Sequence, residues 1–216
     1  MNEHPSGITV TGEGRASSAP DRATLSLGVS SLRKSVAEAR EDAALALQSM
    51  IDALTAAGVT SADIQTRRLS VSPEYDYDKG RQRPRGFRVS NTLTITLRDI
   101  DRTSEVIDAA LAAGGDAALL HGIAFEVEQA EKLQESARTA AVADAHRKAE
   151  TLARAAGVTL GTALRVVEQP SPPDHAPVLR SMALASVAES APTPVSPGEI
   201  EVVVNVTATW TIIAAT

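Results

Sequence analysis

The chain has 216 residues, of which 27 are acidic and 21 are basic, giving a formal net charge of −6 at pH 7. This charge argues against a general polyanion binder, and we expect no nucleic-acid partner. The sequence contains no cysteine, which excludes disulfides, cysteine-liganded zinc, iron–sulfur clusters and thiol catalysis. With 43% apolar and 22% charged residues, the composition is that of an ordinary globular protein.

No export or membrane signal is evident. The first ten residues, MNEHPSGITV, hold no basic region and no apolar run of signal-peptide length. No stretch of about 18 consecutive apolar residues occurs, so we expect no membrane span. The sequence as given predicts a cytoplasmic protein.

The N-terminal part predicts two strands and a long helix. Apolar and polar side chains alternate between residues 8 and 32, and the glycines of residues 12–14 break the pattern. Ser35 and Glu38 have the capping-box spacing that starts a helix, and Gly58 is the expected left-handed stop. The apolar stripe between them consists of Val36, Ala39, Ala43, Leu47, Met50, Ile51 and Leu54.

The next segment predicts a hairpin, a short helix and a further strand. Strands are expected from about 66 to 75 and from 87 to 98, joined by a loop over 76–86. A short helix capped by Asp101 is expected over about 102–113, followed by the further strand. The residues expected to face inward in the strand 87–98 are Phe87, Val89, Leu93, Ile95 and Leu97.

The C-terminal part predicts a second long helix, a long loop and two strands. The helix is expected over about 129–156, and strands near 164–167 and over 199–213. Seven of the eleven prolines lie within 170–198, which predicts a long loop and an arm that contacts a protein partner. The expected inward residues of the second helix, mostly alanines, are Leu133, Ala137, Ala141, Ala145, Ala149, Leu152 and Ala156.

A short repeat suggests internal symmetry. Residues 56–60 and 155–159 both read Ala-Ala-Gly-Val-Thr, and each copy ends a long helix and precedes two strands. The pattern predicts an α+β fold of two pseudo-symmetric β-α-β-β halves, with a mainly antiparallel sheet backed by two long helices.

The expected division follows chain order. The first half covers 8–98, a short helix over 99–116 bridges the halves, and the second half covers 117–213 with the proline-rich loop 170–198. All of these belong to one domain over 1–216.

Motifs for catalysis and cofactor binding are missing. Residues 12–14 lack the third glycine of the dinucleotide fingerprint, and we interpret them as a turn that ends a strand. Ser31 and Lys34 match the S-x-x-K pattern of serine acyl-enzymes, but its companion motifs are absent. The four histidines show no metal-ligand spacing. We therefore predict no enzyme activity, no cofactor and no metal site.

One local charge anomaly is a basic segment. Residues 79–88, KGRQRPRGFR, carry Arg81, Arg83, Arg85 and Arg88, with aromatic residues beside them. Guanidinium groups interleaved with aromatics are used to bind single-stranded nucleic acid. A solvated hairpin tip, or a contact to acidic residues of another subunit, explains the same residues. These four arginines are therefore candidate anion or partner contacts.

Short motifs follow one another over nearly the whole chain: Val10-x-Gly12-x-Gly14, Pro20-Asp21-x-Ala23, Gly58-Val59, Asp63-Ile64-x-Thr66, Leu69-x-Val71-x-Pro73-x-Tyr75, Asn91, Phe125, Arg147-Lys148-Ala149, Ala156-Gly157 and Pro197-Gly198. In this order they resemble the SIMPL-domain family. That family is found in bacterial exported proteins and in an animal partner of a pelle-like kinase.

The resemblance implies two intertwined β-α-β-β halves with one sheet backed by long helices. It also implies assembly, since at least one bacterial member forms a large ring, and a link to oxidative-stress defence or the cell envelope. It offers no catalytic residue to transfer. Bacterial members are often exported, and this sequence lacks the usual export signal.

We therefore expect a non-enzymatic assembly or interaction protein, most simply a homo-oligomer. The proline-rich arm and the terminal strand motivate this hypothesis, because an exposed strand edge needs a partner. Two alternatives stay open. One is a small-ligand or enzymatic role in a cleft between the halves, with Asp21, Arg67, Arg68 and Asn91 as candidate residues. The other is anion or nucleic-acid binding through the segment 79–88.

Overall fold

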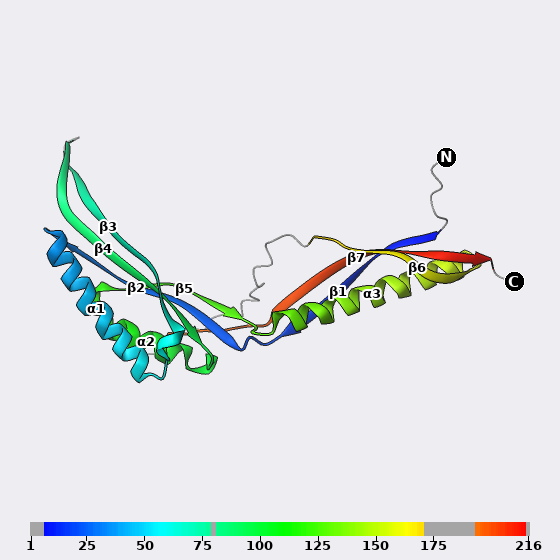
Figure 1. The fold of residues 1–216 in the computed structure, drawn as a ribbon, viewed down its shortest axis with the longest axis horizontal. Coiled ribbons are helices and arrows are strands. Elements are labelled where there is room, and N and C mark those ends of the chain that lie inside the picture. The colour runs from blue at the N-terminus through cyan, green and yellow to red at the C-terminus, as the bar shows by residue number, and fades with distance from the viewer. Residues whose placement is uncertain (1–6, 79–80, 171–192, 215–216) are drawn as a thin grey trace. The chain divides into compact units, whose positions relative to one another are not determined.

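The computed structural model describes residues 7–78, 81–170 and 193–214. In this part of the chain, seven strands form two antiparallel sheets and three α-helices pack against them, so the α+β fold class is confirmed. The elements fall into two compact units, and all of them are drawn in Figure 1. We call them the central unit, built from residues in the middle of the sequence, and the terminal unit, built from both ends.

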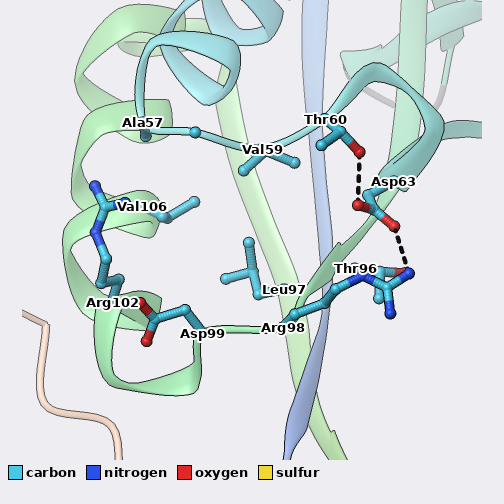
Figure 2. Close-up of a pocket in the computed structure, with 11 residues that line it drawn as sticks. Ala57, Val59, Thr60, Asp63, Thr96, Leu97, Arg98, Asp99, Arg102 and Val106 are labelled. Atoms are coloured by element: carbon cyan, nitrogen blue, oxygen red, sulfur yellow. Dashed lines mark hydrogen bonds and ion pairs between the residues drawn. The ribbon is translucent and has the colours of Figure 1, made fainter. Parts of the chain in front are cut away.

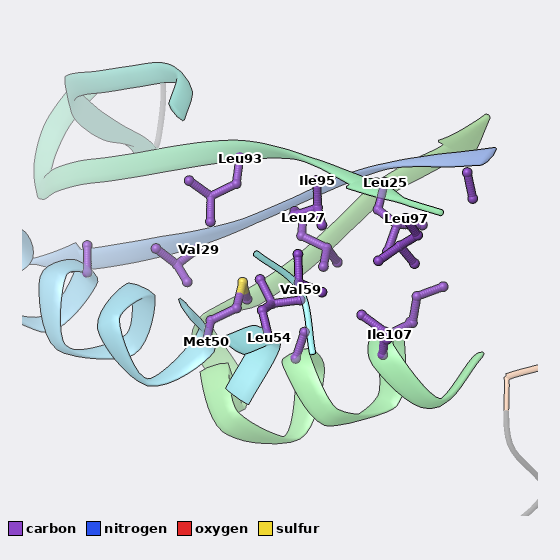
Figure 3. Packing of buried hydrophobic residues seen from close by; sticks show 14 of the residues in the cluster. Leu25, Leu27, Val29, Met50, Leu54, Val59, Leu93, Ile95, Leu97 and Ile107 are labelled. Atoms are coloured by element: carbon purple, nitrogen blue, oxygen red, sulfur yellow. The ribbon is translucent and has the colours of Figure 1, made fainter. Parts of the chain in front are cut away.

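The central unit contains β2 (Arg22–Arg33), α1 (Val36–Ala56), β3 (Ile64–Asp78), β4 (Arg81–Leu97), α2 (Thr103–Gly114) and β5 (Ala118–Glu126). Its sheet has the order β3-β4-β2-β5, and each neighbouring pair is antiparallel. Helices and sheet enclose one apolar core (Figure 3), whose largest fully buried members include Leu25, Leu27, Met50, Leu54, Leu93, Ile95 and Ile107.

The ends of α1 follow the sequence signals. Ser35 Oγ accepts the Glu38 N–H at 3.2 Å, as the capping spacing predicts. Gly58 follows the C-cap residue Ala57 with a φ of +92°, a conformation that favours glycine. The expected cap of α2 is wrong: Asp101 lies in the 3-10 turn Ile100–Arg102, and no side chain caps the helix that follows.

The hairpin β3–β4 is longer than the sequence predicts. The expected loop over 76–86 is wrong, because both strands continue into it. Proline and glycine, which are typical of loops, are accommodated here by a one-residue bulge at Arg85, between the paired positions Pro84 and Gly86. Gly86 has a φ of +150°, which lets the chain take up the extra residue.

The terminal unit contains β1 (Gly7–Ser18), α3 (Ala130–Ala155), β6 (Val158–Glu168) and β7 (Ile200–Ala214). Its sheet has the order β1-β7-β6, so the last strand of the chain is central rather than at an exposed edge. The helix α3 runs along one face of the sheet (Figure 1). Its buried residues recur every fourth position: Ala137, Ala141, Ala145, Ala149 and Ala153. The expected inward positions Leu152 and Ala156 are therefore wrong, and both side chains are exposed.

The contact between α3 and β1 is very close. A methyl group on Gly12 would lie 2.1 Å from Ala141 O, and one on Gly14 would lie 2.0 Å from Ala137 O. Both separations are far inside van der Waals contact, so only glycine fits at either position. The interpretation of residues 12–14 as a turn is wrong, because they lie inside β1 and admit the helix backbone.

The two units differ from the expected halves 8–98 and 117–213. β1 lies in the sheet of β6 and β7, and β5 lies in the sheet of β2, β3 and β4. Two sheets are present in place of the single sheet that the resemblance implied. Corresponding strands nevertheless have the same order, β3-β4-β2 and β6-β7-β1. The exchange of β1 and β5 between the sheets could not be predicted from the sequence, because pairing between distant segments leaves no local sequence pattern.

The proline-rich segment 170–198 is described only at its ends. Residues 171–192, on which most of the predicted partner-contacting arm falls, lie outside the described residues. Thr193 Oγ1 donates to Asp108 Oδ1 of α2 at 2.6 Å, and the Thr193 N–H donates to Oδ2 at 3.3 Å. Val195 packs against the core of the central unit. The end of the segment is thus held against α2 before β7 begins.

Substitution of Gly12 by alanine tests the close approach of α3. We expect G12A to lower the free energy of unfolding of the terminal unit by about 1–3 kcal/mol or more, because the added methyl group forces the helix away from β1. The single tryptophan, Trp210, is buried in this unit and reports its unfolding by fluorescence in urea. Gly122→Ala is the control, since a Cβ at Gly122 meets nothing within 4 Å. Equal urea midpoints for both variants would contradict the packing described.

Candidate functional site

The sheet edges are where this fold leaves backbone groups without a neighbouring strand. Of the strands that the structure describes, four lie at edges: β1 and β6 in the terminal unit, and β3 and β5 in the central unit. A free edge accepts a further strand unless a side chain, a bulge or a proline prevents it.

The edge of β1 is occupied by side chains of α3. Lys148 Nζ donates to Thr11 O at 3.0 Å, and Asp144 Oδ2 accepts the Glu13 N–H at 3.0 Å. Thr11 and Glu13 are two residues apart, so their backbone groups point to the same side of the strand. The two α3 side chains thus take the positions that an added strand would use. Because Gly12 lets α3 approach, both side chains reach this edge.

Asp144 is the charged centre of this arrangement. It accepts hydrogen bonds from Lys148 Nζ at 2.7 Å and from Arg147 at 3.0 Å, besides the one from Glu13 N–H. The hydrogen bond from Lys148, followed by that from Glu13, lowers the pKa of Asp144 from its ordinary value. A groove of about 540 Å³ beside these residues is lined partly by Val10 and Leu152. The carboxylate therefore stays ionised at neutral pH and holds the edge closed.

The edges of β5 and β6 are irregular. β5 has only nine residues, and its register with β2 shifts between Ser26 and Leu27. The register of β6 with β7 shifts twice between Leu160 and Arg165. Bulges of this kind disturb the row of backbone groups that an added strand needs. These two edges are poor acceptors.

The edge of β3 is long and carries exposed apolar side chains. The strand has 15 residues, and it pairs with β4 without a register shift from Arg68 to Glu74. Leu69 is 64% exposed, Val71 51% and Tyr75 44%. Three exposed apolar side chains on one edge strand are unusual for a monomer in water. β3 is therefore the edge most open to a partner.

The four candidate arginines lie on β4, and three of them are exposed. Arg81, Arg83 and Arg85 are exposed, and Arg88 is half-buried. Asp76 of β3 lies opposite Arg83 in register and 3.8 Å from Arg85. The sequence of residues 74–88 holds five basic and three acidic residues, a net charge of only +2. The sequence analysis missed this compensation, because it considered the basic strand without its acidic neighbour.

Arg88 belongs to a network rather than to a free basic patch. Its Nε lies 2.7 Å from Glu74 Oε1, and its Nη1 donates to Ser30 Oγ at 3.1 Å. With Arg85 it lines a cavity of about 640 Å³, where Arg33 forms an ion pair with Asp42. Two of the three arginines that line this cavity are thus bonded closely to carboxylates, and Arg85 lies near a third.

A smaller pocket of about 200 Å³ lies between the end of α1 and the start of α2 (Figure 2). Asp63 accepts the Thr60 hydroxyl at 2.7 Å and Arg98 Nη2 at 3.4 Å. Arg102 Nη2 lies 2.8 Å from Glu105, whose pKa is lowered by this hydrogen bond. Two of the cationic side chains that line this pocket, Arg98 and Arg102, are thus each bonded to a carboxylate, and Asp99 lines it as well.

The four residues considered for a cleft are not brought together. Asn91 lies on β4 opposite Val29 of β2, so Asp21 is about eight residues, or roughly 26 Å, farther along the sheet. Asn91 pairs with the residue of β3 that follows Arg68. Successive residues of a strand point to opposite faces, so the side chains of Arg68 and Asn91 lie on opposite faces of the sheet. In the described ranges no group of three or more His, Asp or Glu side chains is placed to hold a metal ion.

The Ser31–Lys34 spacing also gains no support as a catalytic motif. Ser31 lies in β2 and not on a helix, and its hydroxyl donates to Asp42 Oδ2 at 3.4 Å. The S-x-x-K chemistry depends on one helix face carrying both groups. The sequence analysis did not single out the exposed apolar edge of β3 as a partner surface. It also missed Asp144 and Lys148 at the edge of β1. Their spacing of four on a helix is typical of a solvated ion pair and gave no signal that β1 lies beside it.

Comparison with known proteins assigns the chain to a protein family. The family described as "SIMPL: Protein of unknown function (DUF541)" matches residues 8–210. The chain belongs to the SIMPL family. This SIMPL chain is 32% identical to the 26 kDa periplasmic immunogenic protein of Brucella melitensis, over 95% of this chain and 85% of that protein. It is 31% identical to the uncharacterized protein YggE of Escherichia coli K12, over 84% and 74% of the two chains.

A more distant SIMPL relative is an animal protein. The interleukin-1 receptor-associated kinase 1-binding protein 1 homolog of Xenopus laevis is 26% identical over 75% of this chain and 63% of that protein. The family resemblance is thus confirmed. The Brucella relative is named as periplasmic, which does not fit the cytoplasmic location expected from the sequence. None of the helices described has the length and hydrophobicity of a membrane span.

Substitution of Asp144 tests the closed edge of β1 through its pH dependence. An acid with a lowered folded pKa stabilises the fold above its ordinary pKa, here 3.8, and this stability is lost as the pH falls through the folded value. We expect D144N to unfold at lower urea than the wild type at pH 7, with the difference shrinking below pH 3.8, as followed by Trp210 fluorescence. Asp52→Asn on the exposed face of α1 is the control. A difference that is the same at pH 7 and pH 3 would contradict the assignment.

The compensated charge of the β3–β4 hairpin predicts weak polyanion binding. We expect wild-type protein and the R81A/R83A/R85A variant to bind a single-stranded oligonucleotide equally poorly at 50 mM and at 200 mM salt. True phosphate binding would show a steep salt dependence, because bound counterions are released. A steep dependence in fluorescence anisotropy that the triple variant loses would instead favour nucleic-acid binding through these arginines.

Proposed function

We propose that this SIMPL protein is a non-enzymatic assembly protein whose copies associate into a homo-oligomer. The observation that carries the proposal is the edge of β3, where Leu69, Val71 and Tyr75 remain exposed on a long strand. This edge takes over the role that the sequence analysis gave to the terminal strand, since β7 is central in its sheet. Association of identical copies is the simplest way to cover such a surface.

The arrangement of charges supports a role without catalysis. Reactive side chains in enzymes are held near a cavity with a strongly shifted pKa and a free reacting atom. Around the cavities described above, three arginines are each bonded to a carboxylate: Arg33 to Asp42, Arg88 to Glu74 and Arg98 to Asp63. These pairs stabilise the fold, and the charged groups in them are not free to act on a substrate.

Three further features belong to the proposal. An animal relative is named for binding a kinase, which supports a protein partner, and the segment 170–198 is our candidate contact for it. The periplasmic name of the Brucella relative supports a role outside the cytoplasm, in stress defence or at the cell envelope. The common strand order of the two sheets supports an internal repeat of β-α-β-β units with exchanged strands.

The mass in solution tests assembly directly. We expect size-exclusion chromatography with light scattering at about 50 μM to show a mass that is a multiple of the 22.5 kDa chain. Dilution shifts the equilibrium toward monomer, because association depends on concentration. A clean monomer at this concentration would contradict the proposed function.

A further inference from the structure

We propose that a second copy of this chain adds to β3 as an antiparallel strand, with Ser70 of both copies at the two-fold axis. The inference rests on the proposed assembly and names the surface and the register through which it occurs. β3 is selected because α3 side chains occupy the edge of β1, and register shifts disturb β5 and β6. The regular part of β3 is the remaining edge with exposed apolar side chains on a continuous ladder.

The ends of this regular part define the register. Arg67 has no partner on β4, because the pairing shifts there, and Pro73 has no N–H to offer a further strand. Ser70 is the midpoint between these two positions. A pairing centred on it places Leu69 of one copy opposite Val71 of the other, and repeats the same contact on the other side of the axis.

The backbone pattern agrees with this register. Proline is tolerated in a sheet where its nitrogen faces away from the neighbouring strand, so the backbone groups of Pro73 point outward from β4. Because the pattern repeats every second residue, Leu69 and Val71 also direct their N–H and C=O groups outward. In the proposed pairing these two residues form the hydrogen-bonded pairs. Ser70 then forms the closer, non-hydrogen-bonded pair with its counterpart.

The side chains favour the same arrangement. Leu69 and Val71 of the two copies would form one apolar row across the axis, and they are 64% and 51% exposed in the single chain. Arg68 would lie opposite Ser72 of the second copy, so no like charges face each other. A pairing centred on Arg68 would instead set two arginines side by side.

The absence of cysteine permits a direct test of the register. In the full-length chain Ser70→Cys places two thiols across the axis at a Cα separation of about 4.5 Å, which suits a disulfide. Ser72→Cys, on the same face, is the matched control, because its two thiols would be offset by about 13 Å along the strands. We expect mild oxidation to convert most of S70C, and little of S72C, into a covalent dimer on a non-reducing gel.

The outcomes separate this inference from the assembly on which it rests. If wild type is oligomeric but S70C does not cross-link, or S72C cross-links instead, the surface or the register is wrong and assembly still stands. If wild type is monomeric at about 50 μM and S70C does not cross-link, the assembly proposal itself fails.

Charge placed on the edge gives a second, independent readout. We expect L69K/V71K to lower the mass of the wild-type oligomer, because lysines on an edge strand oppose its pairing with another strand. Leu164→Lys combined with Val166→Lys is the matched control on β6, whose side chains are each 48% exposed. Circular dichroism and the urea midpoint verify that each variant folds. An unchanged mass for L69K/V71K, or an equal loss for the β6 control, would overturn the choice of β3.

Discussion

The close approach of α3 to β1 determines most of what is distinctive in the terminal unit. Gly12 and Gly14 leave room for the helix backbone, and alanines on every fourth position of α3 keep the distance short. Alanine buries little apolar area, so this packing depends on contact at short range rather than on large side chains. The same short distance brings Asp144 and Lys148 to the edge of β1. Packing and protection of the edge therefore have one cause.

The four edge strands differ in a way that suits selective association. On β1 two backbone groups of the free side, Thr11 O and Glu13 N–H, are bonded by side chains, while β5 and β6 are disturbed by shifts of register. β3 also carries a bulge and a proline, but a regular stretch with exposed apolar side chains lies between them. A protein with several equally open edges would polymerise without limit. Leaving one short stretch open favours a closed assembly with a defined register.

Local signals predicted the elements, and distant pairing limited the prediction of the fold. Ser35 and Gly58 marked the ends of α1 correctly, because capping is decided by neighbours in the sequence. The exchange of β1 and β5 between the sheets, and the burial of Ala153 in place of Leu152, depend on contacts with remote strands. The site was harder still. An Asp–Lys pair at a helical spacing has the same sequence pattern whether it is solvated or bonded to a strand edge.

The connectivity separates β1 from its partner strand β7 by almost the whole chain. The central unit is built almost entirely from residues 22–126, so its pairings become available while the chain is still being made. β1 precedes it and pairs only with β7, with Thr9 opposite Thr209 at the far end of the sequence. Until β7 is present, β1 is a strand without a partner and exposed to association with other chains. The helix α3 is synthesised before β7, and its Lys148 and Asp144 bond the second side of β1. The residues that close this edge in the folded protein thus belong to the first element able to cover it.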